Sequence, residues 1–160
     1  MDYSLVFIHG LESTSRGTKA QYFRRLFPKM IIKDYTGDFP TRMKKLRSLL
    51  EGKNNLILVG SSYGGLMAAH YAVENEDRVK KLILIAPALT LEGFENAVSR
   101  PLNMPVVIYH GRQDDVVDPP AVKAIAEKSF RRLTHHLVDD DHPLNRVFPQ
   151  INWTELLEQI

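Results

Sequence analysis

The chain has 160 residues, of which 44% are hydrophobic and 25% charged, as is ordinary for one globular domain. Its formal net charge of +2 is near neutral, and its basic clusters are only pairs, which argues against the continuous basic face of a nucleic-acid-binding domain. The chain has no cysteine, so disulfides, thiol nucleophiles and thiolate metal sites are excluded. No segment has the roughly 18 apolar residues of a membrane span, and the first residues lack the basic region of a signal peptide. We therefore expect one cytoplasmic domain over residues 1–160, with neither a nucleic acid nor a membrane as partner.

In chain order, apolar runs rich in β-forming residues alternate with helical patterns. The runs predict six strands, at 5–8, 30–35, 56–59, 82–86, 105–109 and 133–138. The helical patterns predict helices at 18–27, 41–51, 63–74 and 153–160, another beginning at Pro119, and a short one near 92–98. Helix caps are expected at Thr18 with Gln21, at Asp118, and at Asn152 with Glu155.

The alternation of strands and helices determines the expected fold class. Each connection is long enough for a crossover between parallel strands. We therefore expect an α/β protein with a doubly wound, mostly parallel sheet of about six strands and helices on both faces. In such sheets the functional site lies at the carboxyl ends of the strands.

One of these strand ends carries the frame G-x-S-x-G, at Gly60, Ser62 and Gly64. A strained turn between strand and helix lifts a serine hydroxyl clear of its own backbone, and glycines beside it avoid steric clashes. The start of the following helix supplies amide N–H groups and a partial positive charge. Ser62 is therefore the candidate nucleophile, and the N–H of Tyr63 is a candidate donor to an oxyanion.

Two later strand ends carry a candidate acid and a candidate base. The acids Asp114 and Asp115 follow the fifth predicted strand, and His142 follows the sixth. A serine needs a base to remove its proton, and the base needs an acid to orient it. The chain order serine, aspartate, histidine is that of the α/β-hydrolase triad.

Four motifs in the same order extend this likeness over nearly the whole chain. They are FIHGL, GSSYGG, YHGRQDDVVDP and DDDHPL. With them the chain resembles the α/β-hydrolase superfamily, and in particular small bacterial serine esterases without a cap domain. The superfamily commonly has eight strands, so the resemblance implies a minimal version in which the first two strands are absent.

The resemblance implies a role for each site residue. Ser62 would attack the substrate carbonyl, His142 would be the general base and Asp114 would orient the histidine. Asp115 and Asp118 stay open as alternatives to Asp114, because Asp118 replaces the first proline of the expected G-x-x-D-x-x-V-P pattern. The backbone N–H groups of Leu11 and Tyr63 would form the oxyanion hole.

Five other histidines compete with His142 as the base. The resemblance assigns His9 and His110 to shaping their loops. His70 is expected within a helix, and His135 and His136 are neighbours on one strand. The acidic run at 139–141 is expected to be a solvated turn, because three consecutive residues rarely converge on one ion. We therefore expect no metal site and no cofactor.

The expected function is hydrolysis of small carboxylic esters through an acyl-enzyme intermediate. The resemblance leaves thioesterase and amidase or peptidase activity open, because these share the same machinery. A non-catalytic binding protein with this fold is the alternative of another class. The segment 88–104 is short for a lid, so an open, shallow site for a small acyl substrate is expected. The sequence leaves the oligomeric state open.

Overall fold

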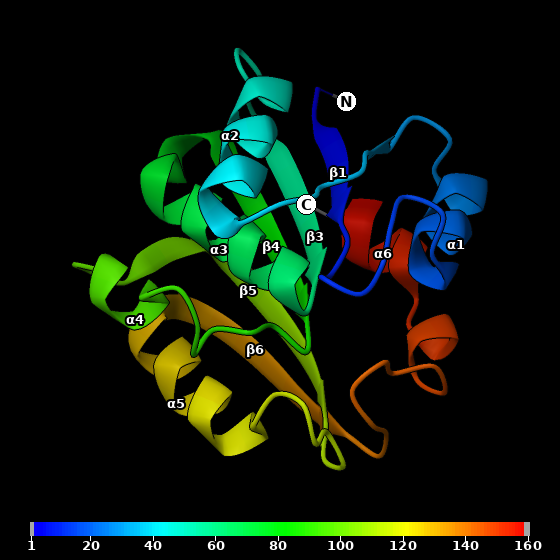
Figure 1. Cartoon of the computed structure of the whole chain (residues 1–160), viewed down its shortest axis with the longest axis vertical. Helices are drawn as coiled ribbons and strands as arrows, with labels where there is room; N and C mark the ends of the chain where they lie inside the picture. The colour runs from blue at the N-terminus through cyan, green and yellow to red at the C-terminus, as the bar shows by residue number, and fades with distance from the viewer. Residues whose placement is uncertain (1, 159–160) are drawn as a thin grey trace.

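The computed structural model describes residues 2–158 and contains one sheet of six parallel strands (Figure 1). The strands lie in the order β2-β1-β3-β4-β5-β6, and every neighbouring pair is parallel. Their bounds are β1 (Ser4–Ile8), β2 (Ile31–Ile32), β3 (Leu56–Ser61), β4 (Val79–Ile85), β5 (Leu102–Gly111) and β6 (Phe130–Val138). The expected parallel α/β sheet is confirmed.

Among residues 2–158, six α-helices lie against this sheet. They are α1 (Thr18–Leu26), α2 (Phe39–Leu49), α3 (Tyr63–Glu74), α4 (Phe94–Ala97), α5 (Pro119–Ser129) and α6 (Trp153–Glu158). Two 3-10 turns, η1 (Glu76–Arg78) and η2 (Phe148–Gln150), lie between them. In Figure 1, α1 and α6 lie on one side of the sheet, and α2, α3 and α5 lie on the other. The helices on both faces are as expected for a doubly wound fold.

The central strands are buried on both faces, and successive side chains serve two different cores. In β3, Leu56 and Leu58 belong to the core beneath α2, α3 and α5. Ile57 and Val59 belong to the core beneath α1 and α6, which includes Trp153. This two-sided burial explains why the strands appear in the sequence as continuous apolar runs.

The start of the first helix differs from the expectation. Thr18 is its first residue and Gly17 its N-cap, and no side chain caps it. Gln21 instead donates a hydrogen bond to the carbonyl oxygen of Arg16, at 2.6 Å. The expected reciprocal cap of Thr18 and Gln21 is therefore wrong.

Helix α2 begins two residues earlier than expected, at Phe39. The Asp38 side chain caps it by accepting a hydrogen bond from the N–H of Thr41 at 2.9 Å. Pro40 is tolerated because the first-turn amides of a helix have no partner within the helix. The caps predicted at Asp118 and Asn152 are both present.

Strand lengths differ most at the second and fifth strands. β2 is limited to Ile31–Ile32 at the edge of the sheet. β5 extends from Leu102 to Gly111, and its pairing with β6 is irregular between Leu102 and Pro105. The last two residues of the helix expected at 153–160 lie outside the described residues. Within 2–158, no helix has both the length and the apolar character that spanning a membrane requires.

Candidate active site

The turn between β3 and α3 holds Ser62 in a backbone conformation with φ 56° and ψ −115°. Non-glycine residues rarely adopt a positive φ, so this turn stores strain. The flanking glycines have no Cβ, and this allows the strand, the turn and the helix to pack closely around the serine. A Cβ on Gly60 would lie 2.4 Å from the carbonyl oxygen of Gly64, and a Cβ on Gly64 would lie 2.0 Å from that of Ile8. The G-x-S-x-G frame therefore has a steric cause at both glycines.

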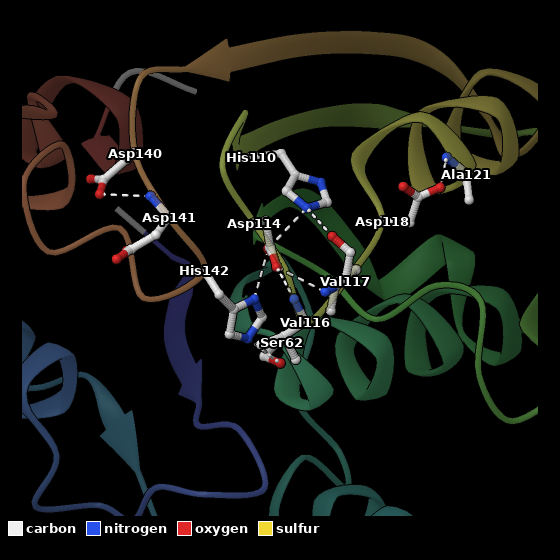
Figure 2. A network of polar contacts seen from close by, with 10 residues as sticks. All are labelled: Ser62, His110, Asp114, Val116, Val117, Asp118, Ala121, Asp140, Asp141 and His142. Carbon is white, nitrogen blue, oxygen red and sulfur yellow. Dashed lines mark hydrogen bonds and ion pairs between the residues drawn. The ribbon is translucent and has the colours of Figure 1, made fainter.

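A continuous series of hydrogen bonds connects three side chains that come from three strand ends (Figure 2). Nε2 of His142 lies 3.0 Å from Oγ of Ser62. Nδ1 of the same ring lies 2.7 Å from Oδ2 of Asp114. The structure thus brings together Ser62, His142 and Asp114, which stand far apart in the sequence. Because a carboxylate accepts at Nδ1, the proton of a neutral His142 lies there, and Nε2 faces the serine as an acceptor.

The Asp114 carboxylate is buried and is held on both of its oxygens. Oδ1 accepts hydrogen bonds from the N–H groups of Val116 at 2.9 Å and Val117 at 2.8 Å. Burial opposes ionisation of this group, but the hydrogen bonds from Val117, His142 and Val116 outweigh it and lower the pKa of Asp114. The aspartate is therefore kept charged beside His142.

The other two acidic candidates lie apart from His142. Asp115 is exposed, with no hydrogen bond from its side chain to the described residues. Asp118 accepts from the N–H of Ala121 at 3.2 Å and caps α5, as Figure 2 shows. Of the three aspartates, only Asp114 contacts His142.

A second histidine contacts the same carboxylate. His110, at the end of β5, is fully buried, and its Nε2 lies 3.1 Å from Oδ2 of Asp114. The same nitrogen lies 3.1 Å from the carbonyl oxygen of Val117. The resemblance predicts only a role in its loop for His110, so the contact with Asp114 is a finding of the structure. Its spacing of four residues from Asp114, across a turn, is the signal that was present.

The loop after β1 approaches the serine closely at Gly10, and Leu11, the next residue, lines the same cavity as Ser62. A Cβ on Gly10 would lie 3.3 Å from Cβ of Ser62. His9 fixes this loop, because its Nδ1 lies 2.7 Å from the carbonyl oxygen of Gly10 and its Nε2 accepts from the N–H of Tyr35 at 2.9 Å. Within residues 2–158, the N–H of Leu11 and that of Tyr63 donate no hydrogen bond. Both amides therefore have no acceptor in the part of the chain that the structure describes.

The side chain of Tyr63 anchors the residue that follows the serine. Its hydroxyl donates to Oε1 of Glu92 at 2.9 Å, and its ring lies 5.6 Å from the guanidinium carbon of Arg42. Phe39 packs edge-on against the same ring. Burial, together with the hydrogen bond to Glu92, raises the pKa of Tyr63 to about 12. The hydroxyl therefore stays protonated and anchors the start of α3.

The remaining histidines lie outside the hydrogen-bonded chain. His70 packs between Phe39 and Phe94, and the ring of His136 stacks on Tyr109. His135 lies on β6, where burial lowers its pKa. His142 is thus the histidine that the structure brings to Ser62.

A cavity of about 500 Å³ opens beside Ser62 and His142. Strand β1 and the loop that follows it contribute Phe7, Leu11 and Glu12 to its lining. Leu11 is 51% exposed and Val116, which also lines the cavity, is 69% exposed. A larger hollow of about 680 Å³ lies at the amino end of β1, and no histidine lines it among the described residues. Of these two cavities, the smaller is therefore the one that Ser62 and His142 line.

Comparisons with known proteins agree with this architecture. The family model described as serine aminopeptidase, S33, matches residues 30–100, which include Ser62 and Tyr63 but not Asp114 or His142. No curated protein matches the sequence. Among solved structures, the alpha/beta hydrolase domain-containing protein 10 from mouse is 22% identical, with a TM-score of 0.72, covering 89% of this chain and 83% of that one.

Two further solved structures are similar over almost the whole chain. Est1E from Butyrivibrio proteoclasticus is 15% identical with a TM-score of 0.78, covering 99% of this chain and 87% of that one. The monoacylglycerol lipase of Paleococcus ferrophilus is 16% identical with a TM-score of 0.70, covering 98% of this chain and 91% of that one. At these identities the likeness concerns the fold. The chain therefore has the fold of the α/β-hydrolase superfamily, as its sequence motifs predict.

Proposed function

We propose that the protein is a serine hydrolase that cleaves small carboxylic esters through an acyl-enzyme intermediate. One observation carries the proposal, namely the hydrogen-bonded chain from Ser62 Oγ through the His142 ring to Asp114. Its two links of 3.0 Å and 2.7 Å lie within the reach that proton transfer requires. The matches to hydrolase structures and to a hydrolase family model support the same reaction class.

In the first step, Ser62 Oγ attacks the ester carbonyl carbon while its proton passes to Nε2 of His142. The imidazolium that forms is stabilised by the charged Asp114 carboxylate. The carbonyl π electrons move to the oxygen, which becomes an oxyanion. The site needs no metal or cofactor for this step, because its own base activates the nucleophile.

The oxyanion would be held by the N–H groups of Leu11 and Tyr63. Both lie next to Ser62 in the chain or in space, and both are free of other acceptors within the described residues. Tyr63 is also the first residue of α3, where the helix dipole favours negative charge. Loss of one such donor typically costs about 3 kcal/mol of transition-state stabilisation.

Collapse of the tetrahedral intermediate breaks the bond to the leaving alkoxide, which takes the proton from His142. A water molecule then loses a proton to the same nitrogen and attacks the acyl-enzyme. The second intermediate expels Ser62 Oγ, which recovers the proton from His142. The products are a carboxylic acid and an alcohol, and the enzyme is regenerated.

The cavity favours substrates with a compact acyl group. Its volume of about 500 Å³ is at the smaller end of the range of ligand pockets. The segment between β4 and β5 holds only the four-residue helix α4, and its Phe94 packs against His70 of α3. The exposed apolar side chains of Leu11 and Val116 offer contact area to such a group.

Amide hydrolysis is the second candidate, favoured by the match to the serine aminopeptidase family model over residues 30–100. The same nucleophile and base would act, with an amine as the leaving group. Paired substrates with one acyl group, a 4-nitrophenyl ester and a 4-nitroanilide, separate the two candidates. A higher kcat/KM for the anilide would reject the ester preference.

The proposal is tested by labelling with a fluorophosphonate probe, which phosphonylates activated serines. Wild-type protein is expected to label, and Ser62→Ala is expected to abolish labelling. Ser61→Ala is the matched control, because Ser61 lines the same cavity one residue away and is expected to label normally. Folded wild-type protein that stays unlabelled, or a Ser62→Ala variant that still labels, contradicts the proposal.

A further inference from the structure

We propose that His110 is a positioning residue of this site. Its ring fixes the orientation of the Asp114 carboxylate and reduces the negative charge on the carboxylate oxygen that contacts His142. The inference rests on the serine-hydrolase function proposed above. It gives His110 a task beyond shaping its own loop. Two hydrogen-bond acceptors face one nitrogen of its ring.

Nε2 of His110 carries a proton, because both of its neighbours are acceptors. One is Oδ2 of Asp114 and the other is the carbonyl oxygen of Val117, each at 3.1 Å. A carboxylate and a carbonyl have no hydrogen to donate. The ring therefore donates a hydrogen bond shared between the two oxygens (Figure 2).

The ring is neutral, so its other nitrogen carries no proton. Nδ1 of His110 is buried and has no hydrogen-bond partner among residues 2–158. Protonation would add a second N–H that is buried and unpaired, which costs free energy. Burial lowers the pKa of His110 despite the nearby Asp114 charge, in agreement with a neutral ring.

The consequence for Asp114 is that four donors define the orientation of one carboxylate. The amides of Val116 and Val117 bind Oδ1, and the two histidine rings bind Oδ2. Because His110 and His142 share Oδ2, the donor on His110 withdraws negative charge from the oxygen that stabilises the His142 imidazolium. Removal of this donor is expected to strengthen that stabilisation.

Other titratable groups near the ring are few in the described residues. Asp114 faces His110 from the loop after β5, and His142 faces it from the loop after β6. His135, on β6, lies close enough for its pKa to be affected by His110. The variants below leave all three of these groups in place, so a changed pH profile reports the loss of the His110 donor.

The test compares His110→Leu, which removes the donor, with His110→Gln, whose amide reaches about as far as Nε2. The rate constant of fluorophosphonate labelling is measured from pH 5 to 9. For His110→Leu we expect a roughly tenfold lower maximum rate, because the carboxylate is less well fixed. We also expect the acid limb of its pH–rate profile, the range in which labelling slows on acidification, to move to higher pH by roughly half a unit. His110→Gln should restore both features toward wild type, and His136→Gln, an exposed histidine on β6, should change neither.

A folded His110→Leu variant with the wild-type acid limb overturns the proposal, even if its rate is lower, because a purely structural role would give that result. Should this variant not fold, the tautomer of His110 in wild-type protein decides. Long-range ¹H–¹⁵N NMR spectra are expected to show a neutral ring protonated at Nε2. A ring protonated at Nδ1 contradicts the hydrogen bond to Asp114. Wild-type protein that does not label contradicts the proposed function instead, and the NMR result is independent of it.

Discussion

Nζ of Lys19 donates a hydrogen bond to the carbonyl oxygen of Pro143, 2.6 Å away, although 124 residues separate them in the sequence. Pro143 directly follows His142, so this bond ties α1 to the loop that carries the candidate base. The same Nζ lies 5.5 Å from the centre of the Phe148 ring. The loop that carries His142 is therefore bonded to a helix from the other end of the chain.

Replacing Lys19 by Met is expected to lower the labelling rate by roughly three- to tenfold, the value of one hydrogen bond. The loop loses its tie to α1, and the His142 ring spends less time within reach of Ser62. Fluorophosphonate labelling measures the effect, and thermal unfolding shows whether the fold is kept. Arg24→Met, an exposed change on the same helix, is the control. Equal rates for both variants would argue against a role for Lys19.

Asp114→Asn is expected to reduce the labelling rate by roughly a thousandfold or more, because an amide donor at Nδ1 favours the wrong histidine tautomer. Asp115→Asn is the matched control, since that side chain is exposed next to it and is expected to stay within twofold of wild type. The comparison decides between Asp114 and Asp115, two of the three aspartates that the sequence left open. Equal losses in the two variants would remove Asp114 from the assigned role.

Ser62→Gly is expected to stabilise the fold relative to Ser62→Ala by about 1 kcal/mol, because only glycine adopts a positive φ without strain. The backbone at this position has φ 56° and ψ −115°. Both variants lack the hydroxyl, so the difference between them isolates the backbone. Urea unfolding of the two proteins measures it. If the alanine variant is as stable as the glycine variant, the turn is not strained.

The strands were predictable where burial on both faces produces continuous apolar runs, as at β1, β3 and β4. The ends of helices and strands were not predictable where a single contact determines them. Helix α2 begins at Phe39 because Asp38 binds a first-turn amide, whereas the apolar spacing begins later. β5 continues to Leu102 because pairing with Phe130 of β6 resumes beyond the irregularity at Pro105. Such ends depend on partners that the local pattern does not contain.

The residues of the candidate site were predictable to the extent that each stands at a strand end. The order of Ser62, Asp114 and His142 led to all three, and their catalytic roles stay predictions. His110 was assigned to its loop because its contact with Asp114 depends on how the loop after β5 folds back. The hydrogen bond from Lys19 to Pro143 could not be predicted from the sequence, because it depends on α1 and the loop after β6 meeting in space.

The buried histidines predict that the fold loses stability on mild acidification. Burial lowers the pKa of His9 and of His110 below the ordinary value of 6.5. The unfolded chain therefore binds protons at these rings at pH values where the folded chain does not. Their contribution to the free energy of unfolding is full above pH 6.5 and is lost as the pH falls toward the folded pKa values, at no more than about 1.4 kcal/mol per pH unit for each ring.

Urea unfolding between pH 5 and 7.5 measures this loss. The His9→Gln variant lacks one such ring. Its side-chain oxygen can accept a hydrogen bond from the N–H of Tyr35, which in wild type donates to Nε2 of His9 at 2.9 Å. This variant is expected to be less stable than wild type at pH 7.5 but to lose less stability on acidification, because it has one fewer ring that must remain neutral in the fold. His136→Gln, on the exposed side of β6, is expected to keep the wild-type slope. A His9→Gln slope as steep as that of wild type would mean that His9 takes up its proton within the folded protein as readily as in the unfolded chain.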